Sequence, residues 1–236
     1  MMRPDVQVAP VKQLLDRLAS DISVEAAHAR ARRGLFAMAL PGGSVGVHGF
    51  PVLATVLFDW DITHIFWADE RAVPASSPDS NFGLADSLWL RKSGAGPSSI
   101  HPMQADVTDL NAAAAAYSDE LVRVLGRTAR LDLVLLGVGP DGHVASLFPG
   151  HAALSEERQL TLPIGDAPKP PPRRLTLSMP MLTSAERVVV MALGESKAAV
   201  MQEALEHEDS RLPVSLVLRR ASRPLVLLDE AAGSRM

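Results

Sequence analysis

The chain has 236 residues, of which 47% are hydrophobic and 21% are charged, so it can bury a substantial core. Its formal net charge of −4 argues against nucleic acid as the main partner, because binding to a phosphate backbone needs a clustered basic excess. The sequence contains no cysteine, which excludes disulfides, Cys-ligated zinc and thiol catalysis. The N-terminal stretch lacks the apolar region of a signal peptide, and no apolar run approaches the roughly 20 residues of a membrane span. We therefore expect a cytoplasmic protein with no membrane partner.

The first half of the chain predicts three helices and two buried strands. Apolar residues at helical spacing indicate the first helix, and short apolar runs that end in Pro-Gly-Gly or in charged residues indicate the strands. Ser80 and either Thr108 or Asp109 are suited to cap the other two helices. In chain order we expect a helix at 11–33, strands at 34–40 and 63–70, and helices at 80–90 and 108–125.

Strands and helices continue to alternate in the second half. The apolar run from Leu131 leads into a glycine-rich turn and a helical start, which Pro149 and Gly150 cut short. The other elements expected here are strands at 173–178, 187–193 and 224–229 and a helix at 195–206. Strands that are apolar throughout and alternate with helices are typical of a parallel sheet covered on both faces. We therefore expect residues 1–236 to form one α/β domain, an open, mostly parallel, doubly wound sheet with helices on both faces in a Rossmann-like three-layer sandwich.

Three of the predicted strands end in sequences with unusual chemistry. These are LPGGS at 40–44, WADER at 67–71 and GVGPDGH at 137–143. In open α/β sheets, ligands bind outside the carboxyl ends of the strands. We therefore expect the three segments to contribute to one site.

The glycines of the third segment match G-x-G-x-x-G, the pattern of a dinucleotide-binding turn. Such a turn needs a full helix after it and an acidic residue about 20 positions on, at the end of the next strand. Here the helix is cut short, and Glu156 and Glu157 do not follow an apolar strand. Asp141 would also place a negative charge beside the pyrophosphate. The sequence therefore disfavours a nucleotide cofactor.

The segment 42–46 matches G-x-S-x-G, the nucleophile elbow of a serine hydrolase. Only about 40 residues precede it, too few for the strands and the oxyanion loop that come before such an elbow. We prefer an anion site, in which Gly42, Gly43 and Ser44 lie at a helix start. Arg71 in WADER offers a planar fork that suits phosphate or an oxyanion, the alternative being a surface ion pair.

His143 has a setting that the other six histidines lack, because it follows a glycine turn at the start of a short predicted helix. The positive end of that helix disfavours imidazolium, so we expect a neutral ring that can act as a base. Neither H-E-x-x-H nor another zinc-ligand spacing occurs in the sequence. We therefore expect no metal site.

Taken together, these motifs resemble those of the 6-phosphogluconolactonase family. WADERAVPASSPDSNFGLA resembles the family's D-E-R-x-V-P…S-N block, and LGVGPDGHVASLFPGH resembles its most distinctive block. APKPPPRRLTLSMPMLTSAERVVVMALGESKAAVM resembles its P-K-P-P-x-R…G-x-x-K-A segment. LPGGSV is a looser match to S-G-G-S-T-P. The resemblance implies a fold similar to ribose-5-phosphate isomerase and glucosamine-6-phosphate deaminase, and a glycine turn that brings His143 to a sugar phosphate.

The implied reaction is the hydrolysis of 6-phospho-D-glucono-1,5-lactone to 6-phosphogluconate, without a cofactor, a metal or a covalent nucleophile. His143 suits the base that deprotonates water, and backbone amides from Gly139 to Gly142 could face the oxyanion. Asp69 either orients His143 or binds a sugar hydroxyl. The phosphate candidates are Gly43, Ser44, Arg71 and Lys197, with Lys169 as a further one.

Two alternatives remain open from the sequence. One is a phosphosugar isomerase or deaminase on the same fold, for which Asp69 or Asp141 would supply the carboxylate base. The other is a phosphosugar-binding sensor without catalysis, which would keep the phosphate residues but has no need of His143. In each case the expected partner is a small sugar phosphate, and the sequence leaves monomer and dimer open.

Overall fold

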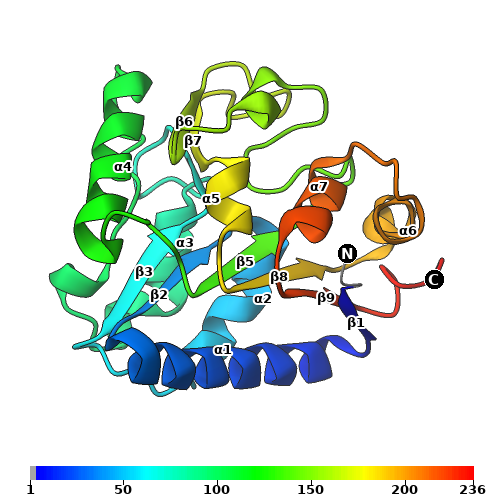
Figure 1. The fold of residues 1–236 in the computed structure, drawn as a ribbon, viewed down its shortest axis with the longest axis horizontal. Helices are drawn as coiled ribbons and strands as arrows, with labels where there is room; N and C mark the ends of the chain where they lie inside the picture. Colours follow the sequence, from blue (N-terminus) through cyan, green and yellow to red (C-terminus); the bar gives the residue numbers. More distant parts are fainter. Residues whose placement is uncertain (1–3) are drawn as a thin grey trace.

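The computed structural model describes residues 4–236, and its centre is a six-stranded parallel sheet (Figure 1). The strands lie in the order β1-β9-β8-β5-β2-β3, and every neighbouring pair is parallel. Their bounds are β1 Asp5–Val8, β2 Phe36–Leu40, β3 Thr63–Trp67, β5 Leu133–Gly137, β8 Arg187–Ala192 and β9 Pro224–Leu228. All residues of β2 and β9 are buried, as expected for strands covered on both faces.

Helices cover both faces of this sheet, so the predicted fold class is confirmed. In Figure 1, α1 runs along one side of the sheet, and α5 and α7 lie on the other. The helices are α1 Val11–Arg33, α2 Gly43–Leu53, α3 Asn81–Leu88, α4 Leu110–Leu125, α5 Met179–Thr183, α6 Ala198–Glu206 and α7 Pro213–Arg220. The side chains of Ser80 and Asp109 cap α3 and α4 as the sequence predicts. None of the helices in the described range is both long and apolar enough to cross a membrane.

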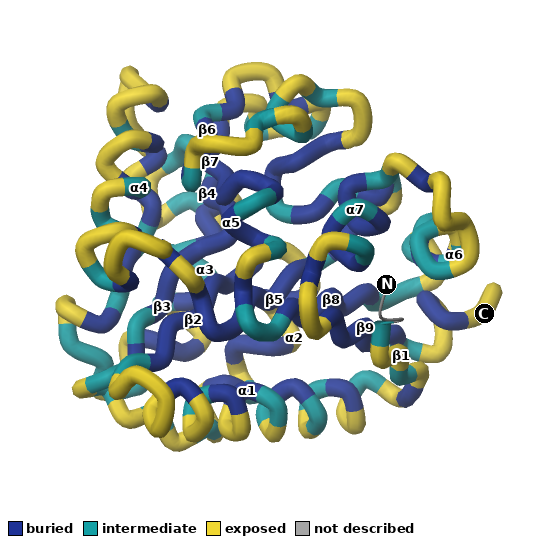
Figure 2. Tube along the Cα trace, in the orientation of Figure 1, coloured by how far each residue is buried: buried dark blue, intermediate teal, exposed yellow. Residues whose placement is uncertain are grey.

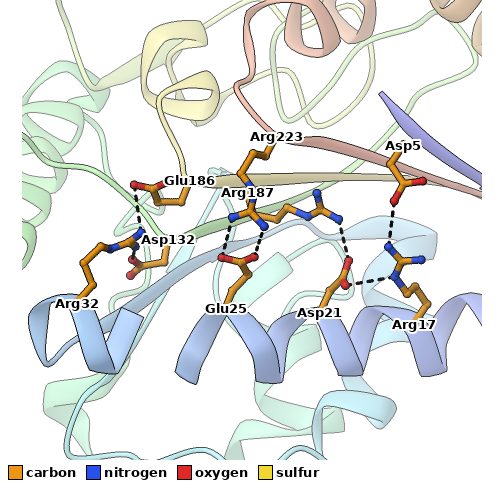
Figure 3. Close-up of polar contacts among 9 residues, drawn as sticks. All are labelled: Asp5, Arg17, Asp21, Glu25, Arg32, Asp132, Glu186, Arg187 and Arg223. Atoms are coloured by element: carbon orange, nitrogen blue, oxygen red, sulfur yellow. Dashed lines mark hydrogen bonds and ion pairs between the residues drawn. The ribbon is translucent and has the colours of Figure 1, made fainter. Parts of the chain in front are cut away.

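A row of ion pairs ties α1 to the sheet (Figure 3). The buried face of α1 includes a carboxylate, Glu25, which pairs with Arg223 at 2.7 Å. Asp21 pairs with Arg187 at 3.2 Å, and Arg32 pairs with Asp132 at 2.9 Å. Since Asp132, Arg187 and Arg223 precede or begin β5, β8 and β9, these contacts hold the amino-terminal edge of the sheet. The opposite edge, where the strands end, is left for the site.

A second, three-stranded antiparallel sheet lies outside the parallel one. It has the order β4-β7-β6, with bounds β4 Asp69–Arg71, β6 Thr161–Ile164 and β7 Arg174–Leu177. The strand expected at 173–178 and the end of the strand expected at 63–70 therefore lie in this second sheet and not in the parallel one. β7 alternates polar and apolar residues, a pattern typical of antiparallel strands, and that alternation distinguishes it from β5 and β8. β1, β6, α5 and α7 were not predicted.

Figure 2 shows that burial follows this architecture, with the inner strands of the parallel sheet mostly dark blue, and with the edge strand β1 and the outer side of α1 largely exposed. Most of the largest buried side chains come from the strands and from the facing sides of α1 and α2, including Phe36, Phe50 and Trp67. The site described next is built on loops that follow the buried strands β2 and β5.

Candidate active site

The chain order creates a crevice between β2 and β5. From β2 the chain passes to β3 on one side and then returns to β5 on the other side of β2. The loops after β2 and β5 therefore leave in opposite directions, which is where ligands bind in doubly wound sheets. A cavity of about 300 Å³ lies there, lined by 41–45, 137–140 and residues of β4 and the 169–174 segment. The three strand-end motifs meet at this cavity, as the sequence predicts.

A histidine–aspartate pair lies at the β5 end of the cavity. Nδ1 of His143 lies 2.5 Å from Oδ1 of Asp141. The ionised carboxylate is only an acceptor, so Nδ1 carries the proton and Nε2 holds the lone pair. Gly139 lines the cavity beside this pair, and a Cβ built there would lie 1.9 Å from His143 Nδ1. A glycine is thus needed at 139 for the ring to occupy its position.

The surroundings keep His143 neutral and Asp141 ionised. Burial lowers the pKa of His143 below its usual value, although the hydrogen bond to Asp141 acts in the opposite direction. Partial burial would raise the pKa of Asp141, but hydrogen bonds from His143 and Lys169 outweigh it and bring the pKa to about 2. A neutral imidazole oriented by a carboxylate has the properties of a general base.

The neutrality of His143 was expected, but the predicted cause is wrong. No helix follows His143, because Val144–Phe148 form turns with a single bridge between Val144 and Leu147. Ala145 has a left-handed φ of +49°, which a helix does not allow. Burial, and not a helix dipole, lowers the pKa of the ring.

The amides of Gly139 and Gly142 are hydrogen-bonded within the turn, and so they are not free to bind a ligand as the sequence suggested. The amide of Gly139 donates to the carbonyl of His143, and the amide of Gly142 donates to the carbonyl of Gly139, both at 2.9 Å. Pro140 has no amide hydrogen. Gly142, with φ +81°, is not part of the cavity lining and packs against Leu212. The expected oxyanion role of the Gly139 and Gly142 amides is therefore not supported.

Asp69 is buried in the wall of the cavity, but it does not hydrogen-bond to His143. Its Oδ2 accepts from Ser146 Oγ at 2.6 Å, and its Oδ1 accepts from Asn81 Nδ2 at 3.1 Å. Of the two predicted roles, direct orientation of His143 is therefore wrong, because Asp141 makes that contact. Binding of a sugar hydroxyl stays a prediction.

The predicted anion residues gather around the amino end of α2. Gly42, Gly43 and Ser44 line the cavity together with Arg71 and Lys197. The first hydrogen bond within α2 runs from Gly46 to the carbonyl of Gly42, so the amides of residues 43–45 precede the helical ladder. Amides in this position, at the positive end of the helix dipole, suit an anion.

Two cations supplement these amides. Arg71 donates through Nη1 to the carbonyl of Asp79 at 2.6 Å, and its buried Nε has no hydrogen-bond partner among residues 4–236. Burial lowers the pKa of Lys197, and repulsion from Lys169 acts in the same direction. A bound anion would satisfy both groups.

Three residues of the site were not predicted. Arg174 from β7 lines the cavity and is buried, while Ser146 and Asn81 hold the two oxygens of Asp69. Asn81 also explains Gly42, since a Cβ at that glycine would lie 1.7 Å from Asn81 Oδ1. Within residues 4–236 no three side chains suited to metal ligation lie together.

Comparison with known proteins identifies the family to which this architecture belongs. Residues 10–226 match the family model of glucosamine-6-phosphate isomerases/6-phosphogluconolactonase. The chain belongs to this family. The 6-phosphogluconolactonase of Rattus norvegicus is 39% identical over 208 residues, covering 85% of this chain and 80% of that protein. That of Streptomyces coelicolor is 33% identical over 249 residues, covering 99% and 95%.

Solved structures in the family share the fold as well. The structure of 6-phosphogluconolactonase from Trypanosoma brucei superposes with a TM-score of 0.87 at 25% identity and covers the whole of both chains. The predicted resemblance, which rested on the three strand-end blocks and the P-K-P-P segment, is thus confirmed.

Proposed function

We propose that this protein is a 6-phosphogluconolactonase, which hydrolyses 6-phospho-D-glucono-1,5-lactone to 6-phosphogluconate in the pentose phosphate pathway. One observation carries the proposal: a neutral histidine oriented by a carboxylate and a group of amides and cations suited to bind an anion line the same cavity. The names of the related proteins support the same reaction. We further propose that the enzyme acts in the cytoplasm on this small sugar phosphate.

In the proposed reaction His143 is the general base. With Nδ1 bonded to Asp141, Nε2 has no hydrogen-bond partner within residues 4–236 and is the atom that removes a proton from water. The water oxygen attacks the lactone carbonyl, and the imidazolium then donates its proton to the ring oxygen as the ester bond breaks. Asp141 stabilises the imidazolium between the two steps, as the carboxylate does in other acid–base pairs.

The phosphate is assigned to the other end of the cavity. Amides of Gly43 and Ser44, the hydroxyl of Ser44, Arg71 and Lys197 supply hydrogen bonds and positive charge there. A dianion held remote from the carbonyl supplies binding energy that can position the reacting end. Asp69 is left to bind a sugar hydroxyl.

An isomerase or deaminase would need a carboxylate base, but Asp69 and Asp141 are both engaged by hydrogen bonds, and the pKa of Asp141 is about 2. We therefore favour hydrolysis over this second activity of the family.

The direct test is to supply purified protein with fresh 6-phosphogluconolactone and to measure acid release and ketose formation on the same sample. We expect hydrolysis above the uncatalysed rate, no ketose, and no loss of rate after exhaustive chelation. The matched control is His143→Gln, which keeps a hydrogen-bonding side chain but cannot act as a base. Ketose formation, or full activity of His143→Gln, would contradict the proposal.

A further inference from the structure

Lys169 contacts the histidine–aspartate pair directly. Its ammonium lies 3.0 Å from Asp141 Oδ1, the same oxygen that His143 Nδ1 contacts at 2.5 Å. It also lies 3.4 Å from His143 Nδ1 itself. One carboxylate oxygen thus accepts hydrogen bonds from both the lysine ammonium and the neutral imidazole of the proposed base.

The position of Lys169 is fixed by a buried arginine. Arg174 is only 4% exposed, and its Nε and Nη2 donate to the carbonyls of three consecutive residues. The distances are 2.8 Å to Pro171, 2.9 Å to Lys169 and 3.3 Å to Pro170. A planar guanidinium with several donors in fixed directions holds such a segment more rigidly than a single bond could.

The same arginine is connected to the rest of the site. Its Nη1 contacts Ser146 Oγ at 3.4 Å, and that hydroxyl donates to Asp69. Its guanidinium lies 5.5 Å from the centre of the Phe148 ring, which also packs on His143 with ring centres 4.7 Å apart. Arg174 therefore contacts both the backbone of Lys169 and the Phe148 ring on which the proposed base packs.

We infer that Lys169 acts on the reaction through the Asp141–His143 pair, as a positioning residue held in place by Arg174, and not as a ligand of the substrate phosphate. The inference rests on the proposed function, because it assigns a role within that reaction. The ammonium of Lys169 already has a carboxylate partner, whereas Arg71 Nε in the anion site has no partner among the described residues.

The consequence follows from the charges that face His143. Asp141 and, at longer range, Asp69 favour the protonated ring, whereas Lys169 disfavours it. Lys197 lies close enough to Lys169 for their charges to repel, and Arg174 lies over the Phe148 ring that packs on His143. Burial, the largest effect, and the charge of Lys169 both lower the pKa of His143, so Asp141 can orient the imidazole without holding a proton on it at neutral pH. Lys169 also disfavours the imidazolium formed after attack, which promotes transfer of its proton to the leaving ring oxygen.

The first test is the pH dependence of kcat/KM for Lys169→Met and Lys169→Arg, with the exposed Lys12→Met as the control for loss of one positive charge. Removing a cation this close changes proton affinity by at least about tenfold. We therefore expect Lys169→Met to lose severalfold in kcat/KM at pH 6 and to recover by pH 8, on phosphorylated and unphosphorylated gluconolactone alike. Lys169→Arg and Lys12→Met should follow the wild type. Taking each variant as a ratio to wild type removes the ionisation of the substrate phosphate, whose second pKa is about 6.

The second test needs no activity and uses the histidine proton signals in NMR, with His143 identified by the signal missing in His143→Gln. In Lys169→Met and Arg174→Met the His143 titration should move to higher pH. If the buried Arg174→Met does not fold, Lys169→Met carries the test alone. An unmoved titration, or a KM increase restricted to the phosphorylated lactone at every pH, overturns the inference. A wild-type protein without lactonase activity overturns the proposed function whatever the titration shows, so the two failures are distinguishable.

Discussion

Gly139→Ala is the substitution that tests the proposed base most selectively. The φ of Gly139 lies outside the left-handed region, so alanine can adopt the backbone conformation without strain. A Cβ there would lie 1.9 Å from Nδ1 and 2.1 Å from Cε1 of His143, and 2.5 Å from Oδ1 of Asp141. The three atoms nearest to this Cβ thus all belong to the histidine–aspartate pair, on which the substitution acts directly.

The size of the effect follows from these distances. Since Cβ contacts under 3.0 Å are essentially never found, the imidazole must move by at least about 1 Å. A displacement of that size at a reacting group costs on the order of 10²-fold in rate, and complete loss of a general base costs about 10² to 10⁴. We expect kcat to fall by about 10² or more, and stability to fall by only about 1 kcal/mol because the ring can move into the cavity.

The assay is the initial rate of 6-phosphogluconolactone hydrolysis, with thermal unfolding measured on the same preparation. Gly165→Ala is the matched control, because a Cβ at Gly165 meets no atom within 4 Å and its φ is also outside the left-handed region. The double variant with His143→Gln should be no slower than His143→Gln alone, since both remove the same function. If Gly139→Ala kept more than a third of the wild-type rate while folding normally, the position of His143 would not matter for the reaction.

Three further predictions concern the anion site and the edge of the sheet opposite it. Lys197→Ala should reduce kcat/KM for the phosphorylated lactone about 10- to 100-fold, because a charge-assisted hydrogen bond contributes about 1.5–3 kcal/mol. The kcat/KM for the unphosphorylated lactone should stay nearly unchanged, and equal losses on both substrates would contradict the phosphate assignment. Arg71→Lys should lose at least about tenfold at limiting substrate, because a point charge replaces a planar fork, and a wild-type rate would show that Arg71 does not bind substrate. Arg223→Met should lower the free energy of unfolding by about 1–2 kcal/mol in denaturant titrations, since it leaves the Glu25 carboxylate buried without its partner. This is less than the roughly 3–5 kcal/mol lost when a fully buried pair is broken, because the Arg223 side chain is 43% exposed. Lys12→Met, which breaks an exposed pair, should change stability by less than about 0.5 kcal/mol and serves as the control.

The parts of the site that the sequence predicts are those where one short segment carries both the fold signal and the chemistry. An apolar strand, a glycine turn and a polar residue follow one another in LPGGS and GVGPDGH, so strand end and site can be inferred together. Even the direction of individual side chains is available in WADER. Successive residues of a strand point to opposite faces, so Glu70 must point away from Asp69 and Arg71. In the structure it does so, and its carboxylate accepts the amides of Asn81 and Phe82 at the start of α3.

The parts that could not be predicted depend on contacts between distant segments. Arg174 enters the site because β7 pairs with β4, with Arg174 opposite Arg71 and Thr176 opposite Asp69. Nothing near residue 174 signals that pairing, because register between strands about 100 residues apart is set by the whole fold. Glu25 is similar, since its burial on an otherwise apolar face of α1 makes sense only beside Arg223. From the sequence alone, a glutamate in a surface helix is expected to be exposed to solvent, because charged side chains are rarely buried without a partner.

The glycine turn after β5 shows how one pattern can serve two chemistries. In a dinucleotide-binding turn the glycines let the backbone approach a pyrophosphate, and an acidic residue within the turn would repel it. Here the second glycine makes room for an imidazole, the amides of Gly139 and Gly142 close the turn on itself, and the acidic residue orients the ring. Asp141, which argues against a nucleotide in the sequence, is therefore the residue that gives the turn its role in the structure. The anion is instead assigned to the start of α2, whose first amides make no hydrogen bonds within the helix. This helix start lines the same cavity as His143, on the other side of the crevice. The end of β5 thus supplies the base and the end of β2 supplies the anion site. The crevice between these two strands, where the chain leaves in opposite directions, brings both to one cavity.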